Sequence, residues 1–242
     1  MQKGLEKVDF YEYLTRIGEG FEGLKNWENQ MIAQINDKMP NFQAPSVVVL
    51  NANPFTVGHR YLVEIAAKRS KSVIVFVIQG KTESGGKGNH ENTGIEIPFQ
   101  DRFALTQKAL SDLSNVVVLP SGPYLISRDD FPSDFLTDKL GNASAHAILD
   151  AMVFCDVCAA LGSKTAFAGD EPRDELSEIH LNALRQACAE AKIVLKVAER
   201  KRLGDKYISG SLVRQDLSNK NMDEVHLLVP DMVFDYLAGH FA

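Results

Sequence analysis

A threonine and a histidine stand where the sequence changes from a strand pattern to a helix pattern. Residues Val47–Ser70 read VVVLNANPFTVGHRYLVEIAAKRS, so Thr56, Gly58 and His59 follow an apolar run and a polar turn. The start of a helix exposes unpaired N–H groups and a partial positive charge, which favours a bound phosphate. A histidine at this point adds one more donor for a phosphate oxygen. The segment therefore predicts a nucleotide site.

A second phosphate-binding segment is indicated far along the chain, where Tyr207–Arg214 reads YISGSLVR. Ser209 or Ser211 can cap a helix that begins nearby. Arg214 then lies one turn into that helix, within reach of a phosphate. Read alone, the segment also fits an ordinary capped helix with a surface arginine. Together, the two segments predict a shared grip on a triphosphate, as in ATP-using nucleotidyltransferases.

Strand and helix patterns alternate from residue 46 onward, which predicts right-handed βαβ units and a mainly parallel α/β sheet. Ligands on such sheets bind at the carboxyl ends of the strands, and the turn before Thr56 lies at such an end. We expect strands at 47–51, 72–79, 116–119, 165–168 and 193–197. We expect helices at 58–69, 99–110, 145–161, 174–190, 212–219 and 232–241.

Residues 1–45 predict a short helical N-terminal arm ahead of a 46–242 nucleotidyltransferase-like domain. Apolar residues recur there at helical spacing in two stretches. They are Phe10, Tyr13, Leu14 and Ile17, then Trp27, Met31, Ile32 and Ile35, with Gly18, Gly20 and Gly23 read as the break between two helices. The apolar stripe fits an arm packed on the main domain. Self-association, as a homodimer, is the alternative that its size suggests.

The composition favours a cytoplasmic globular protein, with 45% hydrophobic and 24% charged residues. A net charge of −6 argues against a dedicated nucleic-acid binder. No apolar run approaches the roughly 20 residues of a membrane helix, and the N-terminus lacks the apolar core of a signal peptide. Three cysteines make no disulfide framework. Cys155 and Cys158 fit small core residues of a helix better than a zinc or redox pair.

Five segments, in their order, resemble the C-terminal ATP-using domain of citrate lyase ligase, also called citrate lyase synthetase. They are NANPFTVGHRYLVEIAA, IPFQDR, SGPYLISRDDFP, FAGDEP and ISGSLVR, and the resemblance runs from about residue 45 to the C-terminus. It implies a Rossmann-like nucleotidyltransferase fold. Proteins of that family usually carry an acetyltransferase-like domain ahead of this one. Only about 45 residues stand there in this sequence, so we expect that domain to be missing.

The resemblance implies an enzyme that activates acetate, or another small carboxylate, with ATP, giving acetyl-adenylate and pyrophosphate. The acetyl group would pass to the prosthetic-group thiol of the citrate lyase acyl carrier subunit, with release of AMP. Mg²⁺ would bridge phosphate oxygens, and no residue is assigned as a metal ligand. Two alternatives stay open. One is an adenylyltransferase or cytidylyltransferase acting on a phosphorylated small molecule, and the other is a non-catalytic nucleotide-binding paralogue.

The resemblance also implies roles for individual residues. His59 and Thr56 would meet the phosphates, and His59 would stabilise negative charge as the α-phosphorus is attacked. Arg214 is implied as catalytic together with His59 and Thr56, and it would bind the β- and γ-phosphates with Ser209 and Ser211. The other implied ATP-binding residues are Asn53, Phe55 and Gly58 at the first turn, Gly169 and Asp170 facing the adenosine, and Ile208.

Four features allow two interpretations each. Arg102 and Arg128 are candidates for holding a carboxylate or phosphate, with a surface ion pair as the alternative. The charged run at 199–202 fits a solvated edge, or a pyrophosphate contact because it precedes the second phosphate-binding segment. The glycine-rich stretch at 81–94 fits a surface loop, or a lid that closes over substrate.

Overall fold

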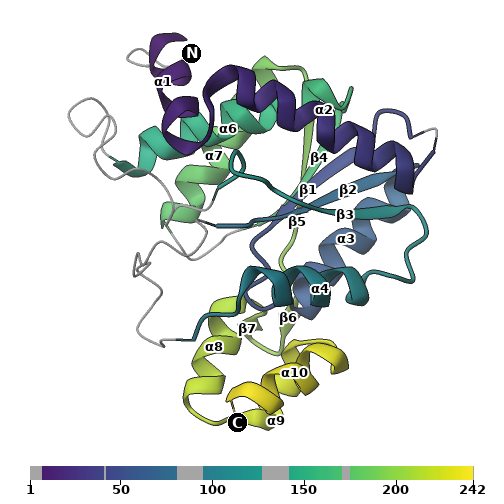
Figure 1. The fold of residues 1–242 in the computed structure, drawn as a ribbon. Coiled ribbons are helices and arrows are strands. Elements are labelled where there is room, and N and C mark those ends of the chain that lie inside the picture. Colours follow the sequence, from purple (N-terminus) through teal and green to yellow (C-terminus); the bar gives the residue numbers. More distant parts are fainter. Residues whose placement is uncertain (1–6, 41, 81–94, 127–141, 171–174, 242) are drawn as a thin grey trace.

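A five-stranded parallel sheet with helices on both faces forms the body of the molecule in the computed structural model (Figure 1). The structure describes residues 7–40, 42–80, 95–126, 142–170 and 175–241. The strand order is β3–β2–β1–β4–β5 and every neighbouring pair is parallel. The strands are β1 (Ser46–Leu50), β2 (Val73–Val77), β3 (Val116–Pro120), β4 (Thr165–Gly169) and β5 (Val194–Ala198). The predicted α/β fold with a parallel sheet is confirmed.

The predicted helices are confirmed, with ends that shift by about three residues at most. A short antiparallel hairpin before α8 and the helix α9 were not predicted. The hairpin strands are β6 (Arg202–Leu203) and β7 (Lys206–Tyr207). The helices are α1 (Lys7–Ile17), α2 (Gly20–Lys38), α3 (Val57–Arg69), α4 (Phe99–Ala109), α6 (Asn142–Ala160), α7 (Glu175–Glu190), α8 (Gly210–Ser218), α9 (Met222–Leu228) and α10 (Asp231–Phe241).

Two hydrophobic cores lie on the two faces of the sheet, because successive side chains of a strand point to opposite faces. On β2, Ile74 and Phe76 pack in one core with side chains of α1, α2, α6 and α7. Val73, Val75 and Val77 pack in the other core with α3 and the C-terminal helices. All five side chains are fully buried. Apolar residues on both faces explain why β2 reads as a continuous hydrophobic run.

The N-terminal arm packs into the first of these cores. Its apolar stripe, including Tyr13, Leu24 and Ile35, is buried against the sheet of the same chain. Because α2 begins at Gly20, the prediction that Gly23 separates two helices is wrong: Gly23 lies inside α2. The homodimer and the division into an arm and a separate domain stay predictions, and the stripe that suggested the homodimer is used within the chain.

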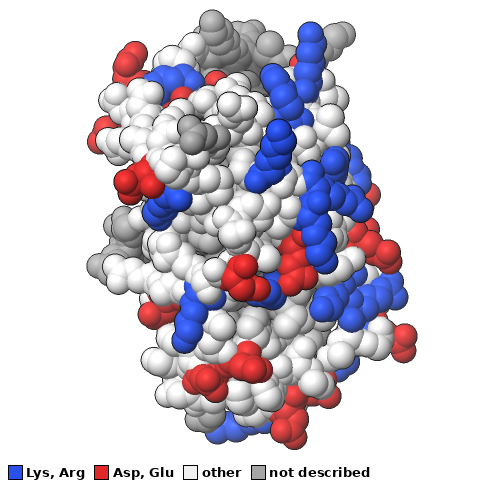
Figure 2. Space-filling model, turned by 90° about the vertical axis from the view of Figure 1, so that its right-hand side faces the viewer, with Lys and Arg blue, Asp and Glu red and all other residues white. Residues whose placement is uncertain are grey.

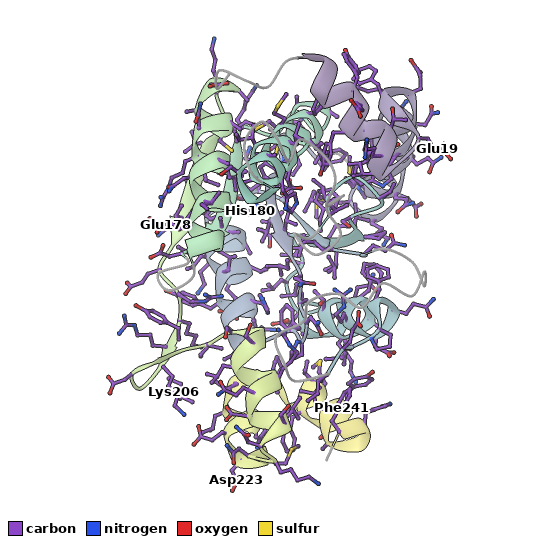
Figure 3. The ribbon with its side chains drawn as sticks, turned by 90° about the vertical axis from the view of Figure 1, so that its left-hand side faces the viewer. Glu19, Glu178, His180, Lys206, Asp223 and Phe241 are labelled. Atoms are coloured by element: carbon purple, nitrogen blue, oxygen red, sulfur yellow. The ribbon has the colours of Figure 1, made fainter. Side chains whose placement is uncertain are left out.

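The edge of the sheet where the strands end faces the viewer in Figure 3. In that view the hairpin with Lys206 lies below the sheet and His180 of α7 lies above it. Figure 2 shows the opposite side of the molecule, where Lys and Arg side chains stand among Asp and Glu side chains. Across the described ranges, no helix is both long enough and apolar enough to cross a membrane.

Candidate functional site

The turn after β1 ends in a reciprocal cap at the start of α3. The Thr56 hydroxyl accepts a hydrogen bond from the backbone N–H of His59 (3.2 Å), and the backbone N–H of Thr56 donates to Nδ1 of His59 (3.0 Å). Because Nδ1 accepts this N–H, the proton of the neutral ring must sit on Nε2. The cap therefore fixes both the position and the tautomer of His59, and it leaves Nε2–H as the donor for a ligand.

His59 stays uncharged over the physiological pH range. Burial among protein atoms, and to a smaller extent the positive charge of Arg200, lowers the pKa of its ring to about 4. The structure thus brings Arg200, on the connection after β5, close to the start of α3. A neutral histidine here can donate a hydrogen bond without adding a second charge beside Arg200.

Titration of His59 should occur about 2.5 pH units below that of an ordinary histidine. The expected midpoint is about pH 4, against about 6.5 for the ring in an unfolded chain. Between these pH values the His59 ring is protonated in the unfolded chain but not in the folded chain. The contribution of His59 to stability is therefore complete above pH 6.5 and is lost as the pH falls toward 4. NMR titration of the histidine ring protons, assigned with the His59→Asn variant, measures the midpoint, and a value near 6.5 would contradict the burial of the ring beside Arg200.

The start of α8 meets the turn after β1 in space. The Ser209 hydroxyl caps α8 by accepting a hydrogen bond from the backbone N–H of Leu212 (3.0 Å). Arg214, whose residue is only 8% exposed, donates from Nη1 to the carbonyl oxygen of Asn53 (2.5 Å) and from Nη2 to the Ser211 hydroxyl (3.4 Å). Two segments that lie about 160 positions apart in the chain are therefore joined directly by Arg214.

Close backbone packing also joins these two segments. A Cβ at Gly210 would lie 2.6 Å from the carbonyl oxygen of Asn53, so only glycine fits this approach. A Cβ at Gly58 would lie 3.4 Å from both a methyl carbon and the carbonyl oxygen of Ile208. The N-termini of α3 and α8 are thus held side by side, and both offer backbone N–H groups to the same region.

The remaining residues predicted around ATP lie along the same edge of the sheet. Phe55 is fully buried, and its ring centroid lies 5.6 Å from that of His59. Gly169 ends β4, and the backbone N–H of Asp170 donates to the carbonyl oxygen of Ala198 at the end of β5 (2.8 Å). Since β4 is the neighbour of β1, these residues border the switch point of the sheet, where open α/β sheets bind ligands. Their contacts with ATP stay predictions.

Arg102 has contacts that the sequence did not indicate. Its guanidinium group donates to the carbonyl oxygens of Asn51 (2.5 Å) and Ile78 (2.9 Å), and its Nε donates to that of Ile97 (3.1 Å). It therefore ties together the chain after β1, the chain after β2 and the start of α4. Binding of a carboxylate or phosphate by Arg102 stays a prediction. Arg128 and the 81–94 stretch lie outside the described residues.

The residue that sequence analysis undervalued is Arg200. The charged run at 199–202 was the available signal, but the sequence favoured its interpretation as a solvated edge. In the structure, part of this run forms β6, and the carbonyl oxygen of Lys201 accepts the backbone N–H of Ile208 (3.0 Å).

Within the described part of the chain, no group of three or more His, Cys, Asp or Glu side chains is placed to hold a metal ion.

Comparison with known proteins agrees with the sequence resemblance. The family model of the citrate lyase ligase C-terminal domain matches residues 45–237. Over 196 residues the chain is 30% identical to a [citrate [pro-3S]-lyase] ligase of Haemophilus influenzae, covering 78% of this chain and 55% of that protein. A protein of the same name from Escherichia coli is also 30% identical, with 78% and 52% covered. The chain thus spans about half the length of the curated relatives that it matches.

A solved structure supports the fold alone. The bifunctional NMN adenylyltransferase/ADP ribose pyrophosphatase from Francisella tularensis superposes with a TM-score of 0.50 and 14% identity, covering 82% of this chain and 49% of that one.

Proposed function

We propose an ATP-dependent ligase activity for this chain, which belongs to the citrate lyase ligase C-terminal domain family. In the proposed reaction, a carboxylate oxygen of acetate, or of another small acid, attacks the α-phosphorus of ATP. The bond between the α-phosphorus and the bridging oxygen breaks, so acyl-adenylate forms and pyrophosphate leaves. A thiolate on the prosthetic group of an acyl carrier protein then attacks the acyl carbon, and AMP leaves.

The observation that carries the proposal is the joined pair of helix N-termini at the switch point of the sheet. The start of α3 supplies the Nε2–H donor of His59, and the start of α8 supplies a second set of free backbone N–H groups. Both sets favour negative charge at the same place. Donors held in advance by caps lose no free energy by reorienting when charge develops on the phosphate. A triphosphate fits this arrangement better than a single phosphate does.

The acid needs no strong base in the proposed reaction, because a small carboxylic acid is already ionised at neutral pH. The work left to the protein is to place the carboxylate in line with the bond that breaks and to stabilise charge on the phosphates. Mg²⁺ would neutralise phosphate oxygens. The described residues offer no cluster of acidic ligands, so phosphate oxygens and water would complete its coordination.

Exchange of labelled pyrophosphate into ATP tests the proposal directly. We expect exchange that depends on an added short carboxylate, and release of AMP when a thiol acceptor is also present. A panel of short acids identifies the preferred one, and a panel of phosphorylated acceptors tests the alternative chemistry. A stable dinucleotide-like product would replace the proposal with an adenylyltransferase. Binding of ATP without exchange or product in any combination would favour a non-catalytic protein.

A further inference from the structure

Tyr124 connects the segment after β3 to the N-terminal arm. The residue is only 2% exposed. Its hydroxyl accepts a hydrogen bond from the backbone N–H of Glu19 (3.1 Å) and donates to the carbonyl oxygen of Gly20 (3.4 Å). Glu19 lies between α1 and α2, and Gly20 is the first residue of α2. One side chain from the segment after β3 therefore pairs with the backbone at the point where the two arm helices meet. Its ring lies 5.8 Å from that of Trp27 on α2.

The arm and the segment after β3 are shaped to fit each other. A Cβ at Gly18 would lie 2.7 Å from the ring of Tyr124, and one at Gly23 would lie 2.3 Å from its hydroxyl oxygen. In the other direction, a Cβ at Gly122 would lie 2.3 Å from Nε1 of Trp27. Gly122 also has a φ of +59°, which favours glycine. Glycines on both partners therefore allow an approach that any side chain would prevent.

The same segment is tied to the neighbouring strand at its other end. The backbone N–H of Ser121 donates to the carbonyl oxygen of Val77 (3.0 Å), and the Ser121 hydroxyl accepts the backbone N–H of Gln79 (2.9 Å). Arg102 donates to the carbonyl oxygen of Ile78, between these two partners. Hydrogen bonds thus run from the arm, across the ends of β3 and β2, to the group that also holds the turn after β1.

The connection from the arm through Tyr124 lies near the place where the second substrate of the proposed reaction, the carboxylate, would bind. The residues proposed to hold ATP lie after β1, at the end of β4 and at the start of α8, which places the nucleotide over one half of the carboxyl edge. The other half, over β2 and β3, would then hold the carboxylate that attacks the α-phosphorus. Residues 121–126 border this half, because they follow β3 and are bonded to the end of β2.

We propose that the N-terminal arm positions the carboxylate-binding half of the site, and that Tyr124 is the positioning residue through which it does so. This inference rests on the proposed function for the identity of the second substrate. It assigns to α1 and α2 a role in substrate binding, although the family model begins only at residue 45. The arm sets where residues 121–126 lie, and those residues in turn border the carboxylate.

The test compares two variants that each lose a single hydroxyl group. Tyr124→Phe removes both hydrogen bonds to the arm while keeping the ring. The matched control is Tyr236→Phe, because Tyr236 of α10 donates to Asp101 of α4 (2.8 Å) on the other face of the sheet. Pyrophosphate exchange is measured with each variant over a range of acetate and ATP concentrations.

We expect Tyr124→Phe to raise KM for acetate by about five- to tenfold, the effect of one or two neutral hydrogen bonds, with KM for ATP unchanged. Tyr236→Phe should lower Tm without changing either KM. A purely structural role of Tyr124 would give the control's result, and equal KM values for wild type and Tyr124→Phe would overturn the proposal.

Hydrogen exchange provides a measurement that needs no turnover. In Tyr124→Phe we expect the backbone amides of Glu19 and Ser121 to exchange at least about fivefold faster than in wild type, which corresponds to about 1 kcal/mol of lost protection. Tyr236→Phe should leave both rates unchanged. If the wild type shows no exchange of pyrophosphate with any acid, the proposed function fails, and this measurement still tests whether Tyr124 couples the arm to residues 121–126. Unchanged rates at both amides would overturn it.

Discussion

His59→Asn is expected to reduce the rate of carboxylate-dependent pyrophosphate exchange by about 10²- to 10³-fold. This is the effect of losing one preorganised donor to a developing negative charge. The asparagine side chain is short enough for its carbonyl oxygen to take the place of Nδ1 and accept the backbone N–H of Thr56. Its amide does not extend to the place of Nε2. The cap on α3 is therefore kept, the donor is lost, and Tm should stay within a few degrees of wild type.

Two further variants make this prediction specific. His59→Gln extends an amide N–H toward the position of Nε2, so it should lose less activity than His59→Asn. His226→Asn makes the same substitution on α9, where the histidine side chain is 52% exposed and pairs with Asp231, and it should behave as wild type. Steady-state rates of pyrophosphate exchange give the comparison. Activity within about threefold of wild type in His59→Asn would remove His59 from the catalytic role.

The sequence was sufficient for the elements that depend on local patterns. Four of the five strands are short runs rich in valine, the exception being β4 with the sequence TAFAG. The helices repeat apolar residues at helical spacing, so both signals lie within about ten neighbouring residues. The hairpin β6–β7 gave weaker signals, because two-residue strands with charged side chains have no period to detect. Gly204 was the one indication in the sequence that a turn lies here, and in the structure its φ is +56°, a value that favours glycine. The seven residues of α9 were equally short.

The glycines of the arm show where local reasoning fails. Gly23 was counted as a helix breaker because glycine weakens an isolated helix by about 1 kcal/mol. Its neighbour Tyr124 is about 100 positions away in the chain, so the need for a small residue at that point appears only in the folded structure. The same holds for Gly210, whose restriction comes from the backbone of Asn53. Packing across the fold decides both positions, and no window of sequence contains it.

In the candidate site too, some features could be predicted from neighbouring residues and others depend on contacts across the fold. The presence of Thr56 and His59 three positions apart at a helix start could be read directly, and the structure adds that they cap each other and fix the ring tautomer. The guanidinium group of Arg102 could not be placed from its neighbours, because its acceptors belong to three different parts of the chain. Sequence reasoning therefore recovered the type of site better than the partners of each charged group.

Arg102→Met is expected to lower the free energy of unfolding by about 3 kcal/mol, because it leaves buried carbonyl oxygens without their charged donor. A loss of this size corresponds to a Tm lower by roughly 6–12 °C in a chain of this length. Arg102 is only 8% exposed, so water cannot readily replace the guanidinium group at the carbonyl oxygens of Asn51 and Ile78. Arg185→Met is the matched control, because Arg185 is an exposed residue of α7. The expected change in its free energy of unfolding is below about 0.5 kcal/mol.

Arg102→Lys separates the observed contacts from the predicted binding of an anion. Lysine keeps the charge but cannot donate in several fixed directions at once, so we expect it to restore only part of the lost stability. If Arg102 also binds the carboxylate, the folded lysine variant should show a raised KM for acetate with KM for ATP unchanged. If Arg102 only holds the strand ends by its hydrogen bonds, the free energy of unfolding measured in urea will change, but KM for acetate and KM for ATP will not. Unchanged stability in Arg102→Met would show that these carbonyl groups find other donors.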